Sequence, residues 1–210
     1  MNKSHSIAAL ALGASALLLV SCGAPPHDPG ASPPLAGARI GGPFALTNQI
    51  GQRVSERDFA GRYTLVYFGY SFCPDVCPVD LGWLMRGLQA FERQDPARGG
   101  RIQPIFITVD PARDTPEAMA NYVRQFHPRL IGLTGSEAEI AAVATKYLVT
   151  FRRQAGVSPG SYAVAHTQLA YLMGPMGEPI ALIPIDKVDT PDVNEGAPEL
   201  VAAELARWVR

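Results

Sequence analysis

Two cysteines separated by three residues have the clearest chemical potential in this sequence. Cys73 and Cys77 follow the apolar run 65–70, which is typical of a buried strand, and each precedes a proline. The apolar residues after Pro78 recur every three or four positions, which predicts a helix over 79–94. Both thiols are therefore expected in a turn between a strand and a helix start. The partial positive charge of the helix end and partial exposure favour the thiolate there.

The two prolines determine how the sulfur atoms are expected to be held. A residue that precedes proline is disfavoured in the α region, so Cys73 before Pro74 and Cys77 before Pro78 are predicted to lie in a stiff loop, not on one helical face. Pro78 also suits the first turn of a helix, where no N–H is needed. Both sulfur atoms are thus expected to be fixed near the helix start before any ligand binds.

A pair of thiols can form a structural disulfide, a redox-active disulfide or part of a metal site. A structural disulfide that closes so short a loop gains little loop entropy. Thiol–disulfide exchange usually uses two intervening residues, one fewer than here. Two thiolates favour Cu(I), Zn or an iron–sulfur cluster, but a metal requires further ligands. The cysteine spacing alone leaves these alternatives open.

Two histidines are candidates for a third ligand. His127 precedes a proline at a predicted helix end, and we expect it to have a structural role at the helix C-terminus. His166 enters the predicted apolar strand 167–173, where it is interpreted either as a buried structural histidine or as a metal ligand. His27 lies in a predicted tether and is assigned no role. Asp75, between the cysteines, is expected to form the turn or to lie just outside the ligand set.

The N-terminus has the pattern of a bacterial lipoprotein signal, with an ordinary secretory signal as the alternative. Lys3 is followed by an apolar run over 7–20, which is too short to span a bilayer comfortably, and then by Ser21 and Cys22. Residues 1–21 are predicted to be removed, and Cys22 to carry the lipid. A multiply acylated cysteine anchors a soluble domain to a membrane. The domain is thus expected outside the cytoplasm, on the periplasmic side, where thiols can be oxidised.

Length and composition favour one domain behind this signal. The chain of 210 residues is 47% hydrophobic and has a formal net charge of −1. No basic stretch is interleaved with aromatic residues, so nucleic-acid binding is not expected. Three cysteines are too few for a disulfide-built scaffold. Residues 22–39, which begin with a stretch rich in proline, glycine, alanine and serine, are predicted to be a flexible tether, and residues 40–210 a single domain.

Strand and helix patterns along the domain predict an α/β fold, in which a mixed central sheet is flanked by helices. Loops are expected at 95–101 and 155–160, and residues 174–177 are expected to form a hairpin turn. The predicted elements, in order, are strands 44–47 and 53–54, a helical turn at 55–59, strand 64–70, helix 79–94, strand 102–109, helix 116–126, strand 130–133, helix 137–147, strands 149–153, 167–173 and 179–185, and helix 199–209.

Three blocks follow one another along the domain: Phe68-Gly69-Tyr70-Ser71-Phe72-Cys73-Pro74-Asp75-Val76-Cys77-Pro78, then Thr108-Val109-Asp110-Pro111-Ala112-Arg113-Asp114-Thr115-Pro116, then Ala165-His166-Thr167 before a Tyr-Leu-Met strand. With these blocks the chain resembles the Sco/SenC family of copper-binding proteins over about residues 40–210. The resemblance implies a thioredoxin-like fold, here with an N-terminal strand extension, and copper bound by Cys73, Cys77 and His166. Two thiolates and one imidazole suit both Cu(I) and Cu(II), whereas zinc normally requires four ligands.

The resemblance also implies a function. The expected protein is a membrane-anchored copper chaperone, and not an enzyme, that assists assembly of the binuclear copper centre of a haem-copper (cytochrome c) oxidase. Its expected partners are the copper-centre subunit of the oxidase, an upstream copper donor and a thiol reductant. The thiols must be reduced to bind copper, so a Cys73–Cys77 disulfide is the expected oxidised form. The alternatives are a thiol–disulfide oxidoreductase that acts on an oxidase subunit or another extracytoplasmic protein, and a thiol peroxidase.

One residue departs from the family pattern. Many members have an aspartate directly before the histidine, whereas this chain has Ala165. An acidic neighbour can tune a ligand or a partner contact. Its absence affects the expected copper affinity and redox behaviour, and not the ligand set. Asp110 and Asp114 match the second block, where loop structure with an Arg113 ion pair is expected in preference to a docking role.

Overall fold

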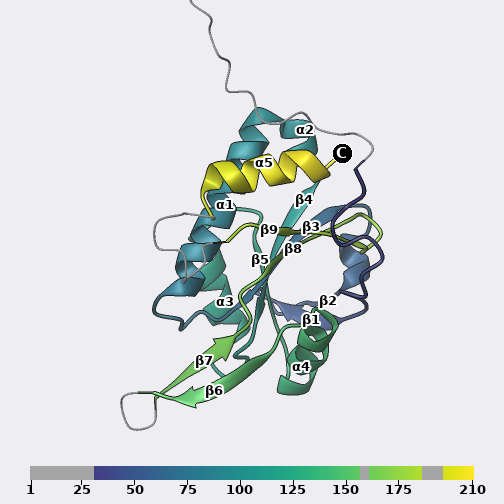
Figure 1. Cartoon of the computed structure of the whole chain (residues 1–210). Helices are drawn as coiled ribbons and strands as arrows, with labels where there is room; N and C mark the ends of the chain where they lie inside the picture. Colours follow the sequence, from purple (N-terminus) through teal and green to yellow (C-terminus); the bar gives the residue numbers. More distant parts are fainter. Residues whose placement is uncertain (1–30, 157–160, 186–195) are drawn as a thin grey trace, which may run out of the picture.

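The structure is a computed structural model that describes residues 31–156, 161–185 and 196–210 (Figure 1). The predicted signal peptide, Cys22 and His27 lie outside the described residues. Within the described ranges, no helix has both the length and the apolar character needed to cross a membrane. The elements are β1 (Ala45–Asn48), β2 (Arg53–Ser55), the 3-10 helix η1 (Glu56–Phe59), β3 (Tyr63–Gly69), α1 (Val76–Gln94), α2 (Pro96–Gly99), β4 (Ile102–Thr108), α3 (Pro116–Val123), β5 (Ile131–Thr134), α4 (Glu137–Lys146), β6 (Phe151–Ala155), β7 (Tyr162–His166), β8 (Ala170–Met173), β9 (Pro179–Ile183) and α5 (Pro198–Trp208).

Seven strands form one mixed sheet in the order β2-β1-β5-β4-β3-β8-β9. β4 pairs in parallel with β3 and with β5, whereas β8 runs antiparallel to β3 and β9 antiparallel to β8. The β1–β2 hairpin extends the sheet beyond β5. The predicted mixed sheet with an N-terminal strand extension is therefore confirmed.

The centre of the sheet is buried on both faces. Every residue of β3 and β4 is buried, as expected for parallel strands covered on both sides. Leu65 and Tyr67 pack in a cluster with α1, α3 and α5, while Val66 and Phe68 pack with α4 and η1. Burial of each such large apolar side chain contributes about 1.5–3 kcal/mol to folding before the entropy of ordering is subtracted. This packing makes β3 a rigid base for the cysteine turn that follows it.

α1 begins earlier than its sequence pattern predicts. It starts at Val76, so Cys77 lies in the first helical turn and not in the preceding loop. The prediction that Pro78 keeps Cys77 out of the helix is wrong. In the first turn the N–H that proline lacks has no helical acceptor, and the carbonyl four residues earlier, at Pro74, lies outside the helix and escapes a clash. Cys73 lies outside the helix, as predicted.

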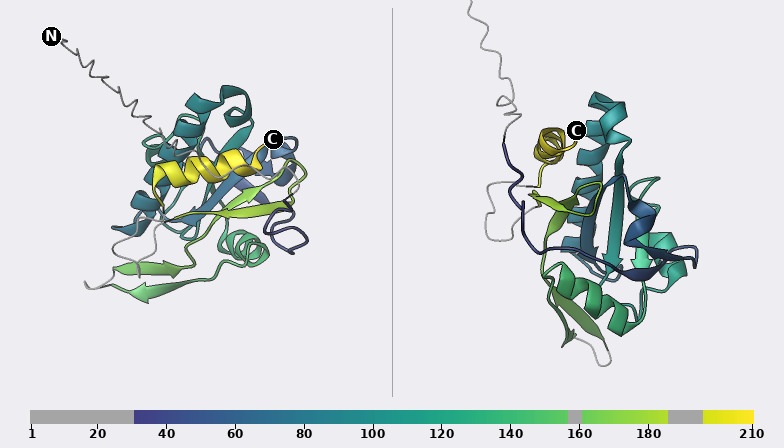
Figure 2. Two further views of the ribbon diagram at one scale, coloured as in Figure 1. Left: turned by 45° about the horizontal axis from the view of Figure 1, so that its top comes forward. Right: turned by 90° about the vertical axis from the view of Figure 1, so that its right-hand side faces the viewer.

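β6 and β7 form a separate two-stranded ribbon that projects from the body of the molecule (Figures 1 and 2). β7 has no counterpart among the predicted elements, and the predicted strand 167–173 is wrong at its start. β7 ends at His166 and β8 begins only at Ala170. In β7 the exposed residues are the small Ala163 and Ala165, so the chain lacks the apolar and polar alternation that marks a strand.

Smaller differences concern the ends of elements. β6 begins only at Phe151 because Leu148 and Val149 close α4: Leu148 has a positive φ of 56°, and Val149 N–H donates to the carbonyl oxygen of Ala144 at 2.9 Å. The predicted loop 95–101 contains α2, which Asp95 caps through its side chain. In the described part of the predicted tether, Leu35 N–H donates to Ile180 O of β9 at 3.0 Å. The predicted hairpin turn 174–177 is confirmed, with Gly177 N–H donating to Gly174 O at 2.9 Å.

Candidate metal centre

β3 and α1 position the two cysteines. Cys77 is fully buried and Cys73 is partly exposed, and both are free thiols. The backbone N–H of Cys77 donates to Cys73 Sγ at 3.5 Å. A Cβ on Gly69, the last residue of β3, would lie only 3.2 Å from Cys77 Sγ and 2.9 Å from the Phe106 ring. The absence of a side chain at Gly69 therefore lets the buried sulfur pack directly against the strand end.

The two thiols have opposite acidities. A hydrogen bond from the Cys77 thiol lowers the pKa of Cys73 to about 5, helped by the backbone N–H groups of Asp75 and Cys77. The same hydrogen bond, together with burial, raises the pKa of Cys77. At neutral pH Cys73 is therefore the thiolate, and Cys77 is the thiol that donates to it.

β7 brings His166 to the cysteines from a distant part of the chain. Its Nε2 lies 3.3 Å from Cys77 Sγ, and its Nδ1 lies 3.0 Å from the carbonyl oxygen of Thr167. A carbonyl can only accept, so Nδ1 carries the proton and Nε2 is left unprotonated, facing the sulfur of Cys77. Burial lowers the pKa of His166, which keeps the ring neutral. A neutral imidazole with a free nitrogen is the form that binds metals.

The three side chains are neighbours, but they do not form a preformed metal cage. Ligand atoms about 2.0–2.3 Å from a metal at trigonal angles lie roughly 3.8 Å apart. Cys77 Sγ and His166 Nε2 are somewhat closer, at 3.3 Å. Across residues 31–156, 161–185 and 196–210, no three His, Cys, Asp or Glu side chains already have the arrangement of a metal site. The donor types suit a soft metal ion, and a small adjustment of the side chains would be needed to bind it.

The second sequence block ties the cysteine turn to β4. The buried carboxylate of Asp114 accepts hydrogen bonds from the Ser71 N–H at 3.0 Å and from the hydroxyls of Ser71 and Thr108. Burial raises the pKa of Asp114, although these hydrogen bonds oppose the shift. Asp110 is also buried and forms the predicted ion pair with Arg113. The ion pair expected between Asp110 and Arg113 is therefore confirmed, and both aspartates stabilise the loop.

Asp80 is a buried carboxylate that the sequence pattern does not single out. It follows Cys77 by three residues in α1, so both side chains lie on the same helical face. The Tyr67 hydroxyl donates to Asp80 Oδ2 at 2.8 Å. The only signal in the sequence is an acidic residue at an otherwise apolar position of the helix. Asp75, the other acidic residue of this region, occupies the N-cap position of α1 without a side-chain capping bond.

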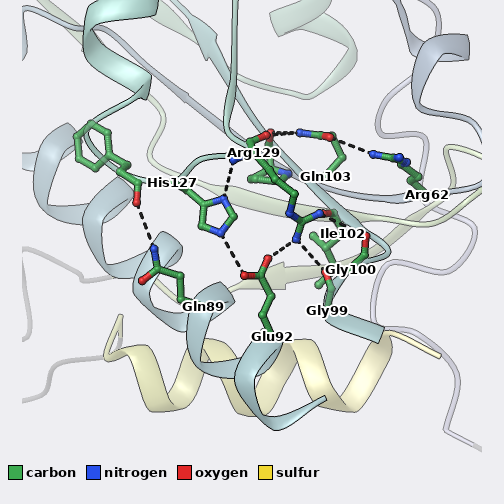
Figure 3. Close-up of polar contacts among 11 residues, drawn as sticks. Arg62, Gln89, Glu92, Gly99, Gly100, Ile102, Gln103, His127 and Arg129 are labelled. Atoms are coloured by element: carbon green, nitrogen blue, oxygen red, sulfur yellow. Dashed lines mark hydrogen bonds and ion pairs between the residues drawn. The ribbon is translucent and has the colours of Figure 1, made fainter. Parts of the chain in front are cut away.

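His127 lies in a separate polar cluster (Figure 3). Its Nδ1 accepts from the Arg129 N–H at 3.1 Å, so Nε2 carries the proton and points to Glu92 Oε2 at 3.3 Å. Glu92 also pairs with the Arg129 guanidinium. Along α1, Glu92 lies about 22 Å from Cys77. The expected structural role of His127 is confirmed, but its partner is a carboxylate and not a helix C-terminus.

Two hollows lie on the surface of the domain. One, of about 330 Å³, adjoins His166 on the ribbon and is lined by Thr150, Phe151, Arg152, Ala165, His166 and Thr167. Another, of about 340 Å³, lies between η1 and the β8–β9 turn and contains neither cysteine nor His166. The first hollow gives solvent a route to the imidazole. The two hollows are similar in volume, so the candidate centre is identified by its side chains and not by the size of a cavity.

Comparisons with known proteins agree with this fold. Residues 32–201 match the protein-family model described as SCO1/SenC. The chain is 41% identical over 139 residues to Protein SCO1 homolog, mitochondrial, of Homo sapiens, which covers 66% of this chain and 46% of that protein. It is 40% identical over 140 residues to Protein SCO1, mitochondrial, of Saccharomyces cerevisiae, with the same two coverages. The chain therefore spans about half the length of these relatives.

Solved structures show the same similarity. Bradyrhizobium japonicum ScoI with copper bound is 40% identical, with a TM-score of 0.68 over 80% of this chain and 99% of that chain. Arabidopsis thaliana ScoI with copper bound is 34% identical, with a TM-score of 0.69 over 80% of this chain and 98% of that chain. These similarities confirm the predicted thioredoxin-like fold.

Proposed function

Because the chain belongs to the SCO1/SenC family, as its sequence blocks predicted, we propose that it binds copper through Cys73, Cys77 and His166 and delivers it to the binuclear copper centre of a haem-copper oxidase. The observation that carries the proposal is the 3.3 Å approach of His166 Nε2 to Cys77 Sγ across 89 residues of sequence. The solved structures of the relatives from Bradyrhizobium japonicum and Arabidopsis thaliana, both with copper bound, support it.

The three side chains divide the work of binding. Cys73 is partly exposed and is the thiolate at neutral pH, so it meets the incoming ion first. Cys77 is buried and holds its proton, which it gives up on becoming the second ligand; loading therefore releases a proton. His166 adds a neutral nitrogen donor. Two thiolates and one imidazole hold copper in either oxidation state.

The proposed cycle depends on the redox state of the thiols. Reduced Cys73 and Cys77 accept copper, and their disulfide is the oxidised, copper-free form that a thiol reductant must reopen. An upstream donor supplies the copper, and the copper-centre subunit of the oxidase receives it. We propose that the protein acts from an extracytoplasmic membrane surface, anchored by a lipid on Cys22.

Copper titration of the reduced chain tests the proposal. We expect one copper per chain, and a loss of Cu(II) affinity of at least about 10–100-fold in His166→Ala, because removing a ligand costs no less than removing a residue that only orients one. His127→Gln is the matched control, because the glutamine amide keeps an N–H donor for Glu92. Glu92 lies near the C-terminal end of α1, far from Cys77 at its start. A wild type that binds no copper, or a His166→Ala variant that binds as tightly as the wild type, would refute the three-ligand site.

A thiol–disulfide oxidoreductase is the second candidate function. The lowered pKa of Cys73, beside a buried partner thiol, is the observation that favours it, because a thiolate is the attacking species in disulfide exchange. This activity would reduce protein disulfides without copper and would survive His166→Ala. Turnover of a disulfide substrate by the copper-free His166→Ala variant at the wild-type rate would favour this function over copper delivery.

A further inference from the structure

One guanidinium lies between the two elements that carry the candidate ligands. Arg113, in the loop between β4 and α3, stacks on Tyr162 of β7 with its Cζ 3.7 Å from the ring centroid. The same Cζ lies 5.0 Å from the ring centroid of Phe72 and 5.6 Å from that of Tyr70, and both of these residues belong to the cysteine turn. Arg113 therefore touches the cysteine turn on one side and the histidine ribbon on the other.

Hydrogen bonds fix this guanidinium and the ribbon to each other. Arg113 Nε pairs with the buried carboxylate of Asp110, and Nη1 donates to the carbonyl oxygen of Tyr162 at 3.1 Å. The Tyr162 hydroxyl in turn donates to Asp110 Oδ1 at 2.9 Å. Arg113 therefore binds the backbone of Tyr162, and Asp110 binds its side-chain hydroxyl. Only 24% of the Arg113 side chain is exposed, so solvent screens these contacts less than it screens a surface ion pair.

Side-chain contacts, and not the main sheet, join the ribbon to the body: Val164, Phe151 and Tyr162 pack with the cluster that contains Val66 and Phe68, and Arg153 pairs with Glu137 of α4. β6 and β7 pair only with each other in the described structure, and their ladder is not part of the main sheet. Tyr162 is the first residue of β7 and His166 the last, about 13 Å apart along the strand. A contact that holds Tyr162 therefore sets the angle at which His166 reaches Cys77.

We propose that Arg113 is a positioning residue for copper binding: by clamping Tyr162 against the cysteine turn, it holds His166 Nε2 within reach of Cys77 Sγ. This inference rests on the proposed function. Without the clamp, Tyr162 is released at the far end of β7 and His166 is held less closely to Cys77, so the two thiolates become the main protein ligands. Cu(I) is soft enough to be held by two thiolates, whereas Cu(II) also needs the nitrogen donor. Loss of Arg113 therefore weakens Cu(II) binding far more than Cu(I) binding.

The contacts of Arg113 with Tyr162 are also of limited strength. Arg113 Nη2 is buried and has no hydrogen-bond partner among the described residues. An unpaired buried donor offsets part of the stabilisation that the other contacts give. A clamp of limited strength is what a copper carrier requires, because the ligand set must come apart when the ion is passed on.

Arg113→Gln tests the inference in the full chain. We expect a loss of Cu(II) affinity of about 10–100-fold, as is typical when a residue that orients a ligand is removed. We also expect loss of the nitrogen coupling in the electron-spin resonance spectrum, and a change in Cu(I) affinity of less than about threefold. Without copper, amides of β6 and β7 should exchange hydrogen faster than in the wild type. Gln154→Ala is the control, because Gln154 is exposed on the same ribbon, opposite Ala163, and does not line the hollow beside His166.

A double-mutant cycle separates positioning from general damage. If Arg113 acts through His166, Arg113→Gln has no effect on Cu(II) affinity in the His166→Ala background. Tyr162→Ala opens the clamp from the ribbon side, leaves the Asp110–Arg113 pair intact, and should reproduce the loss. Wild-type Cu(II) affinity in both clamp variants, or an equal loss with and without His166, overturns the inference while the proposed function stands. A wild-type Cu(II) affinity that does not depend on His166 overturns both.

Discussion

α1 carries Cys77 and contains two glycines in different surroundings, so one substitution is expected to have opposite effects at the two positions. A Cβ on Gly87 would lie 2.4 Å from Val201 Cβ and from its Cγ1, and 3.0 Å from the carbonyl oxygen of Pro198. At Gly82 the nearest atom is a guanidinium nitrogen of Arg86 at 3.7 Å, an ordinary contact with a flexible side chain. Gly87 is therefore where α5 closes on α1, and Gly82 is not.

The magnitudes follow from these distances. Replacing a glycine inside a helix with alanine stabilises the protein by about 0.5–1 kcal/mol, because the unfolded chain loses conformational freedom and helix propensity rises. Gly82→Ala should give this gain. At Gly87 the same gain is opposed by overpacking, which costs roughly 1–3 kcal/mol. Val201 Cβ cannot move away by rotating its side chain, so the helices themselves must separate. We expect a net loss of about 0.5–2 kcal/mol in Gly87→Ala.

Urea unfolding followed by circular dichroism measures both changes. With a denaturant slope of about 2 kcal/mol per molar, 1 kcal/mol moves the midpoint by roughly 0.5 M. The midpoint should rise in Gly82→Ala and fall in Gly87→Ala, with the slope unchanged in both. A midpoint that rises in Gly87→Ala, or one that falls in Gly82→Ala, would refute the helix packing described above.

Three further predictions concern single side chains. Leu148→Gly should raise the free energy of unfolding by about 1 kcal/mol in the same urea assay, because Leu148 has a φ of 56° and is 63% exposed; an unchanged midpoint would argue against strain there. Iodoacetamide at pH 6.5 should label Cys73 and spare Cys77, as mass spectrometry can show, because only Cys73 is a partly exposed thiolate; equal labelling would contradict the assignment. Hydrogen bonds from the Ser136 N–H and Arg53 lower the pKa of Glu139 from 4.5 to about 2, so its stabilisation is complete above pH 4.5 and is lost as the pH falls towards 2. Glu139→Gln should therefore lose less stability over that range than the wild type, and parallel acid curves would contradict this.

Much of the fold can be predicted from local patterns. The continuous apolar run that becomes β3 and the three- and four-residue spacing that becomes α1 both reflect burial against neighbouring layers. β7 cannot be predicted from its pattern because its exposed positions are alanines. The start of α1 is hard to predict because a proline near a helix start has two opposite effects on helix formation. Pro78 both restricts the residue before it and fits the first turn.

The site is less accessible to local reasoning. Cys73 and Cys77 can be found from their spacing, but the approach of His166 to Cys77 depends on the path of β7, which only tertiary structure fixes. Family resemblance supplied that pairing before the structure placed the two residues side by side. Neither the local sequence pattern nor the family resemblance predicts the Asp80–Tyr67 hydrogen bond. It joins a helix to a strand through buried polar groups that leave no periodic signal in the sequence.

The central claim is that His166 Nε2 completes a copper site with Cys73 and Cys77. The electron-spin resonance and optical spectra of the Cu(II)-loaded chain test it most directly. We predict nitrogen coupling together with strong sulfur-to-copper charge-transfer absorption in the wild type, loss of the nitrogen coupling alone in His166→Ala, and loss of the charge-transfer band when both cysteines are replaced by serine. A wild-type spectrum without nitrogen coupling, or one that His166→Ala leaves unchanged, would contradict the claim.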